Sequence, residues 1–186
     1  NHAVMITKEG RGLAIGSNEN GQIIDTIPKE IYEDEQIINI TDQYGHDSQL
    51  ISAVCGHDYT LYLVCSKNSD YNQLVYVYSN ENNGHPLFLN LHGRSPTCLF
   101  GGWKTSAAID SEEGVYVITR SVFKSPNHSI KRSFLPNGEK ATSIACCNSF
   151  VVVSTSSGRV FGSSLEDLES GRSCRLFFDP VVELED

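Results

Sequence analysis

The stretch ATSIACCNSFVVVSTSSGRVFGSS, from Ala141 to Ser164, decides the fold class of this chain. Its Val-rich run from Phe150 and the following RVF segment flank a polar turn at Ser157-Gly158, which is the pattern of an antiparallel hairpin. The whole chain of 186 residues has the same bias, with 14 Val and 14 Ile against 7 Ala and 1 Met. Because β-branched residues favour strands, we expect an all-β fold and exclude an all-helical one.

Three earlier segments repeat this pattern of two strands around a polar turn. They are NHAVMITKEGRGLAIGSNENGQI (1–23), ISAVCGHDYTLYLVCS (51–66) continued by QLVYVYSNENNG (73–84), and TCLFGGWKTSAAIDSEEGVYVIT (97–119). Aligning Ala3, Thr60, Ser106 and Phe150 gives steps of 57, 46 and 44 residues. Unequal steps argue against a solenoid with one rung length and favour blades of several strands, joined by loops of variable length.

The repeated words resemble the repeats of the regulator of chromosome condensation family. The matching residues are Gly10, Gly16, Asn18, Gly21 and Gln22 in the first copy, Gly56 and Gly102 in the second and third, and Gly158, Val160 and Phe161 in the fourth. The family's histidine is present as His2, whereas Tyr59, Thr105 and Ser149 replace it in the other copies, and Cys146 stands for the glycine of the last. The resemblance implies a seven-bladed β-propeller with blades of about fifty residues.

We therefore predict one propeller-like repeat domain over residues 1–186, with copies at about 1–49, 50–95, 96–139 and 140–186. Seven blades need about 350 residues, so four copies form a partial propeller whose edges and apolar faces need a cover. Three covers are open from sequence: a longer protein, a second copy or partner chain that completes the ring, or two terminal strands that share a blade.

The charge balance narrows the class of partner. The net charge of -9 repels phosphate backbones and anionic headgroups, so we expect no nucleic acid partner, and a basic protein fits better. No apolar run reaches the length of a membrane span. The six cysteines lack C-x-x-C spacing and four of them lie in apolar runs, which favours a reducing compartment, the cytoplasm or the nucleus.

Patterns for catalysis or metal binding are missing from the sequence. The six histidines include no pair at metal-ligand spacing, and neither a G-x-S-x-G elbow nor a phosphate loop occurs. We therefore predict no metal, no cofactor and no enzymatic activity. Catalytic groups that meet only in the fold stay open, because sequence spacing does not reveal them.

Two places are candidates for protein binding. His57-Asp58 and Trp103-Lys104 hold the same position in the second and third copies, where a strand-entrance turn and blade packing are the structural alternatives. The basic stretch 120–140 contributes Lys124, Lys131 and Arg132 on a long blade connection. The Asn-rich turns at 18–20 and 80–83 are interpreted as satisfying backbone groups rather than binding a ligand.

These features together predict a non-enzymatic scaffold that binds another protein through the loops of a β-propeller. The alternative implied by the family resemblance is guanine-nucleotide exchange on a Ran-type small GTPase, which would make such a GTPase the protein partner. Self-association that completes the ring is a further expectation.

Overall fold

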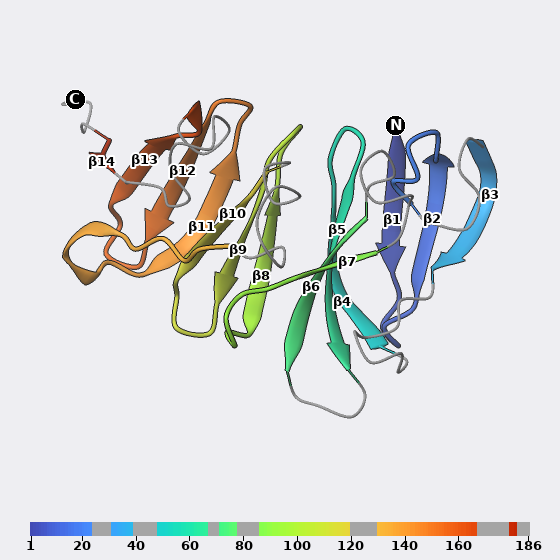
Figure 1. The fold of residues 1–186 in the computed structure, drawn as a ribbon, viewed down its shortest axis with the longest axis horizontal. Coiled ribbons are helices and arrows are strands. Elements are labelled where there is room, and N and C mark those ends of the chain that lie inside the picture. Colours follow the sequence, from blue (N-terminus) through green and yellow to red (C-terminus); the bar gives the residue numbers. More distant parts are fainter. Residues whose placement is uncertain are drawn as a thin grey trace.

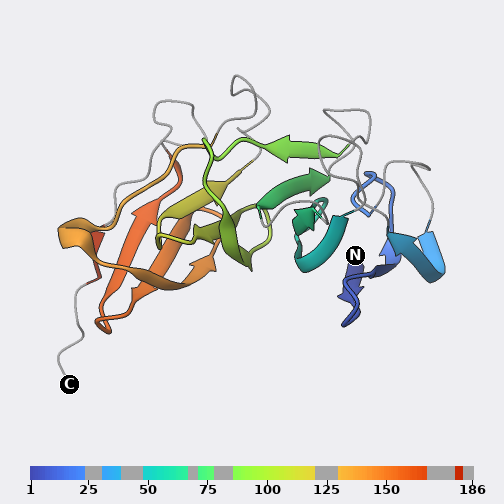
Figure 2. The same ribbon diagram turned by 90° about the horizontal axis from the view of Figure 1, so that it is seen from below.

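The computed structural model describes residues 1–23, 31–38, 48–66, 71–77, 86–119, 130–166 and 179–181. Within these residues the chain forms four antiparallel sheets, and the predicted all-β class is confirmed. The sheets stand in a row in chain order, with the two ends of the chain at opposite ends of the row (Figures 1 and 2). No helix in the described part of the chain is long and apolar enough to cross a membrane.

The strands follow one another as simple up-and-down blades. The first sheet contains β1 (His2–Ile6), β2 (Gly12–Ser17) and β3 (Ile31–Ile38), and the second contains β4 (Ser48–Cys55), β5 (Thr60–Ser66), β6 (Asn72–Val77) and β7 (Leu87–Leu89). The third contains β8 (Pro96–Gly101), β9 (Ser106–Asp110) and β10 (Val115–Ile118), and the fourth contains β11 (Ala141–Cys146), β12 (Phe150–Thr155), β13 (Val160–Ser164) and β14 (Asp179–Pro180). A bridge from Ser133 to Val115 extends the third sheet, and Pro136–Gly138 form a single 3-10 turn.

The loop after the first strand of the second, third and fourth sheets shows how the copies align. Gly56 N–H donates to the Tyr59 carbonyl at 3.0 Å, and Gly102 N–H donates to the Thr105 carbonyl at 2.9 Å. In the fourth sheet the same bond runs from Cys147 to Phe150 at 2.9 Å. The predicted alignment of the fourth copy was therefore wrong by one residue.

The corrected alignment puts Cys147 in the place of the glycine and Val151 in the place of Thr60 and Ser106. Val151 pairs with Cys146 as Thr60 pairs with Cys55 and Ser106 with Gly101. Because the two cysteines are adjacent, the sequence alone allows either of them to be aligned with the glycine. The strand pairing selects Cys147. By the same alignment β1 corresponds to β5, so the described residues hold no counterpart of β4 in the first sheet.

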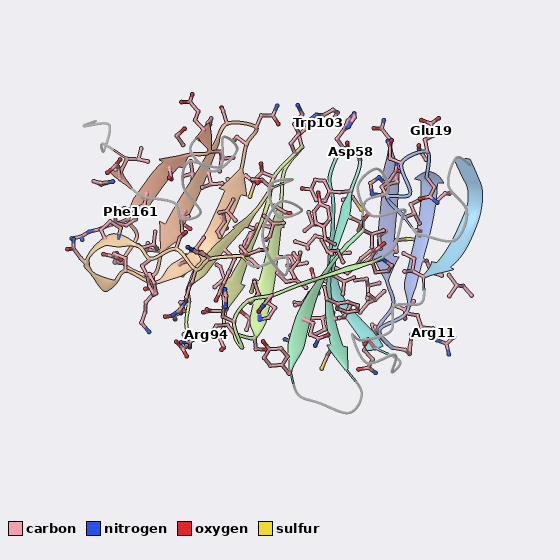
Figure 3. All side chains as sticks on the ribbon, viewed as in Figure 1. Arg11, Glu19, Asp58, Arg94, Trp103 and Phe161 are labelled. Carbon is pink, nitrogen blue, oxygen red and sulfur yellow. The ribbon has the colours of Figure 1, made fainter. Side chains whose placement is uncertain are left out.

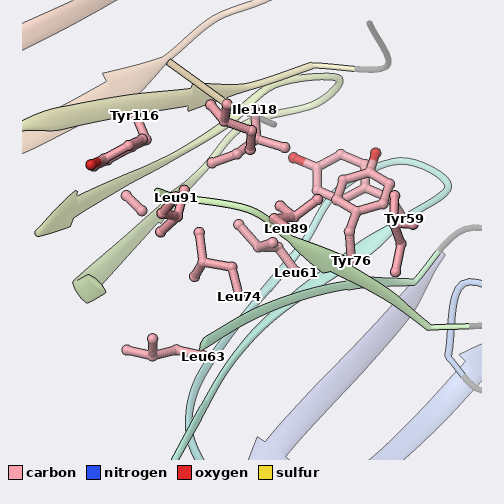
Figure 4. Packing of buried hydrophobic residues seen from close by; sticks show 12 residues of the cluster. Tyr59, Leu61, Leu63, Leu74, Tyr76, Leu89, Leu91, Tyr116 and Ile118 are labelled. Carbon is pink, nitrogen blue, oxygen red and sulfur yellow. The ribbon is translucent and has the colours of Figure 1, made fainter. Parts of the chain in front are cut away.

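Apolar cores fill the spaces between successive sheets. Side chains of a strand alternate between its two faces. Leu61 and Leu63 of β5 therefore pack toward the third sheet, and Tyr62 and Val64 pack toward the first. Figure 4 shows the core between the second and third sheets, where the Tyr59 and Tyr76 rings stack with centroids 5.0 Å apart. Each inner sheet thus buries both of its faces.

A buried polar turn joins the first sheet to the second. Asn18 is fully buried, and its Oδ1 accepts the backbone N–H of Ile23 at 2.8 Å. The Gln22 Oε1 accepts the N–H of Asn20 at 2.8 Å. This confirms the backbone role predicted for the turn at 18–20, while the turn at 80–83 lies outside the described residues.

His2 completes this seam through Thr60. The Thr60 hydroxyl donates to the Gln22 carbonyl at 2.5 Å, and the His2 Nε2 lies 2.8 Å from the same hydroxyl oxygen. Because that hydroxyl already donates its proton, the His2 Nε2 carries a proton and donates it to the Thr60 oxygen. Burial lowers the pKa of His2 from its usual 6.5 to about 4, since a charged ring would lose its hydration there.

This pKa predicts a loss of stability in mild acid. Between pH 6.5 and 4 the unfolded chain binds a proton at His2 that the folded chain does not, so the free energy of unfolding falls as the pH falls. The ceiling of this contribution is about 3 kcal/mol. We expect urea unfolding of H2Q, which keeps a donor for Thr60, to show a shallower decline than the parent chain over this range. Equal declines would contradict the assignment.

Candidate functional site

Four of the predicted binding residues lie on two neighbouring loops at one end of the sheets. His57 and Asp58 belong to the loop between β4 and β5, and Trp103 and Lys104 belong to the loop between β8 and β9. Figure 3 labels Asp58 and Trp103 at this end, and Arg11 and Arg94 at the opposite end. The packing of the second sheet on the third brings together loops that are about forty residues apart in the chain.

The two loops are bonded to each other. The His57 N–H donates to the Trp103 carbonyl at 2.9 Å, and their rings lie with centroids 4.4 Å apart at an angle of 43°. One residue further along, the Tyr59 hydroxyl donates to the Gly102 carbonyl at 3.0 Å. Burial raises the pKa of Tyr59 to about 12, so this hydroxyl keeps its proton at neutral pH. The loops therefore form one connected surface.

This surface contains the ring pair of His57 and Trp103 and, next to His57, the Asp58 carboxylate. Trp103 is 53% exposed, and the next residue, Lys104, is exposed as well. Asp58 is buried, with 7% of its surface exposed, and its Oδ2 lies 3.9 Å from the His57 Nδ1. The strand-entrance turn predicted for these residues is present, and the indole remains open to solvent. An exposed Trp on a fixed loop is the kind of side chain that anchors protein interfaces.

Arg132 lies at the opposite end and is bound within the third sheet. Its Nε lies 2.8 Å from the Asp110 Oδ2, and its Nη2 donates to the Asp110 Oδ1 at 3.0 Å. The Asp110 side chain has no exposed area, and the guanidinium also lies over the Phe134 ring at 5.0 Å. Gly114 makes room for this pair, because a Cβ there would lie 1.8 Å from the Arg132 Nε. Lys131, next to it, is exposed.

The seven predicted residues thus do not form one site. His57, Asp58, Trp103 and Lys104 meet at one end, Lys131 and Arg132 lie at the other, and Lys124 lies outside the described residues. Their role in binding stays a prediction.

A charged groove that the sequence did not indicate lies beside Arg132. It has a volume of about 430 Å³, and its lining includes Glu112, Glu113, Glu139 and Lys140. These charges are paired: Lys140 Nζ lies 2.8 Å from the Glu113 Oε2, and Arg159 Nη1 donates to the Glu139 Oε1 at 3.1 Å. The acidic residues of the groove could have been suspected from the turn IDSEEG at 109–114. Their basic partners come from later segments of the chain, so the sequence did not show the pairing. Among the described residues, no group of three His, Cys, Asp or Glu is placed to hold a metal ion.

Comparison with known proteins gives matches of structure alone. No family model and no curated protein matches the sequence. Human WBSCR16 matches with a TM-score of 0.64 at 15% identity, over 98% of this chain and 51% of that one. Prp20p from Saccharomyces cerevisiae matches with a TM-score of 0.64 at 13% identity, over 99% of this chain and 49% of that one. Yeast RCC1 (Prp20) bound to Kap60 matches with a TM-score of 0.63 at 11% identity, over 88% of this chain and 40% of that one.

These matches confirm the predicted fold class. The four sheets have the fold of β-propeller blades, as in human WBSCR16 and Prp20p. The chain spans about half the length of the propellers from human WBSCR16 and Prp20p. At these identities the likeness concerns the fold, and it assigns no residue a function.

The ion pair of Arg132 predicts a sharp contrast with its neighbour. R132A leaves the buried Asp110 carboxylate without its partner, so we expect the free energy of unfolding to fall by about 3 kcal/mol. K131A removes an exposed charge one residue away and is expected to change it by less than about 0.5 kcal/mol. Urea denaturation of both variants measures the difference. A similar small effect for both would show that Arg132 is a surface charge.

Proposed function

We propose that this chain is a non-enzymatic scaffold that binds another protein through the loop end formed by His57, Asp58, Trp103 and Lys104. The single observation that carries the proposal is the exposed Trp103 indole, which packs against the His57 ring on two loops that are hydrogen-bonded to each other. Loops on a rigid β scaffold are where binding residues concentrate. A Trp whose loop is already ordered loses little conformational freedom when a partner covers it.

The proposed partner is a basic protein. The net charge of -9 favours approach of a positively charged surface. The open face of an indole attracts an Arg or Lys side chain, and the Asp58 carboxylate behind His57 adds a negative charge at the same place. The proposed location is the cytoplasm or the nucleus, because the six cysteines lack C-x-x-C spacing.

A pair of aromatic variants tests this function. W103A is expected to weaken partner capture by more than about tenfold, because truncating a central interface Trp commonly costs 2 kcal/mol or more. F134A removes an aromatic residue of similar exposure, 58%, at the other end and is expected to leave capture unchanged. The measurement is quantitative crosslinking and pull-down from cytoplasmic and nuclear extracts, with melting curves to verify folding. Equal capture by the parent chain and W103A, or none by either, would remove the proposal.

The second candidate is guanine-nucleotide exchange on a Ran-type small GTPase. It is supported by likeness to Prp20p, whose crystal structure was described together with the binding of that protein to Gsp1p and histones. It predicts that this chain accelerates release of a fluorescent guanine nucleotide from a Ran-type GTPase. Release at the intrinsic rate at every concentration of the chain would reject exchange and leave the scaffold proposal untouched.

A further inference from the structure

Three asparagines of the chain are followed directly by a glycine. They are Asn20, Asn83 and Asn137. An Asn-Gly pair is chemically labile, because the backbone nitrogen of the glycine can attack the side-chain amide carbon of the asparagine and no Cβ obstructs it. Asn83 lies outside the described residues. The other two lie in turns that differ in burial and packing, so the fold is expected to affect them differently.

The turn that contains Asn20 is held closed by buried groups. The Gly21 nitrogen, which would make the attack, donates its hydrogen to the Asn18 carbonyl at 2.8 Å, and Gly21 is buried. The Asn20 N–H donates to the Gln22 Oε1, also at 2.8 Å. Asn18 and Gln22 are both buried, with 2% or less of their surface exposed, where the first sheet joins the second. Opening this turn therefore disrupts the packing of two sheets, which makes it a rare event.

The turn that contains Asn137 lies on the surface. Pro136–Gly138 form one 3-10 turn without a buried residue, closed by the Glu139 N–H, which donates to the Pro136 carbonyl at 3.1 Å. Asn137 and Gly138 are both exposed, and both have a left-handed backbone, with φ of 56° and 71°. A Cβ on Gly138 would meet no atom within 4 Å, so the space around the attacking nitrogen is open. A single exposed turn of this kind is among the parts of a protein that open most readily.

We propose that Asn137 is a site of spontaneous deamidation in the folded protein and that folding protects Asn20. The Gly138 nitrogen bonds to the side-chain carbonyl carbon of Asn137, and the amide nitrogen takes up the proton of the Gly138 N–H and leaves as ammonia. Water then opens the cyclic imide that results. Cleavage between the nitrogen and the side-chain carbonyl gives aspartate. Cleavage between the nitrogen and the main-chain carbonyl gives isoaspartate, in which the chain continues through the former side chain.

The modified turn borders the charged groove. Glu139 and Lys140, which follow the turn, both line the groove, so either product adds a carboxylate close to its rim. Glu139 also joins the turn to the hairpin between β12 and β13, because it accepts the Ser157 hydroxyl at 2.6 Å and the Arg159 Nη1 at 3.1 Å. Deamidation of Asn137 therefore adds an unpaired negative charge beside a groove whose charges are otherwise paired with one another.

Peptide mapping by mass spectrometry tests the site on the parent chain. Folded protein is incubated at mildly alkaline pH, and a second sample in urea gives the rate that the sequence alone allows at each pair. Replacement of the amide nitrogen by oxygen raises the peptide mass by about 1 Da, and isoaspartyl methyltransferase labelling identifies isoaspartate. We expect folding to slow Asn137 by less than about tenfold and Asn20 by more than about a hundredfold. Protection of Asn137 that equals or exceeds that of Asn20 would overturn the proposal.

Two variants test the attacking group. G138A adds a methyl group next to the attacking nitrogen, so we expect conversion of Asn137 to slow by more than about tenfold while that of Asn20 stays the same. N20S removes the amide of the protected turn and is expected to leave conversion of Asn137 unchanged. Melting curves verify that both variants fold, and the map of the parent chain decides the question if either does not. Conversion of Asn137 at the parent rate in folded G138A would overturn attack by the Gly138 nitrogen.

Discussion

Face-to-face packing of apolar sheets is the interaction on which this structure depends. A strand points successive side chains to opposite faces, and in the inner sheets both sets are apolar, so Leu61 and Tyr62 of β5 enter two different cores. Such a sheet is stable only with a neighbour on each side, because either face alone in water would expose a large apolar surface. The row of four sheets is the direct result of this requirement.

Packing of the sheets also determines where polar groups meet. The seam between the first two sheets buries Thr60 with the Gln22 carbonyl, and the next seam joins the Tyr59 hydroxyl to the Gly102 carbonyl. Buried hydroxyls of this kind need a partner, so each bond helps to set the position of one sheet on the next. The contact between His57 and Trp103 lies on the same seam as the Tyr59 bond, and the candidate binding surface is therefore attached directly to the packed core beneath it.

The two ends of the sheets have different chemistry. One end carries the exposed indole of Trp103 against the His57 ring, while the other carries Arg132, Asp110 and the paired charges of the groove. Ion pairs within a chain satisfy their own charges, which leaves less for a partner to gain. An exposed aromatic ring keeps its apolar surface available for burial by another protein. This contrast is why the proposed function is assigned to the end that holds Trp103.

The sequence by itself determined the strands, their hairpin turns and the alternation that makes each sheet apolar on both faces, because these depend on residues close together in the chain. It also placed His57 and Trp103 at equivalent positions of two copies. The tertiary structure alone decided that their loops touch, that Arg132 is held by the buried Asp110, and that Cys147 rather than Cys146 replaces the glycine. Each of these depends on pairing or packing between segments that are distant in the chain, and a local sequence pattern does not determine such contacts. The same reason applies to Met5 and Phe150, which align with the buried Tyr62 and Tyr59 of the second copy, whereas the arrangement of the sheets leaves them exposed.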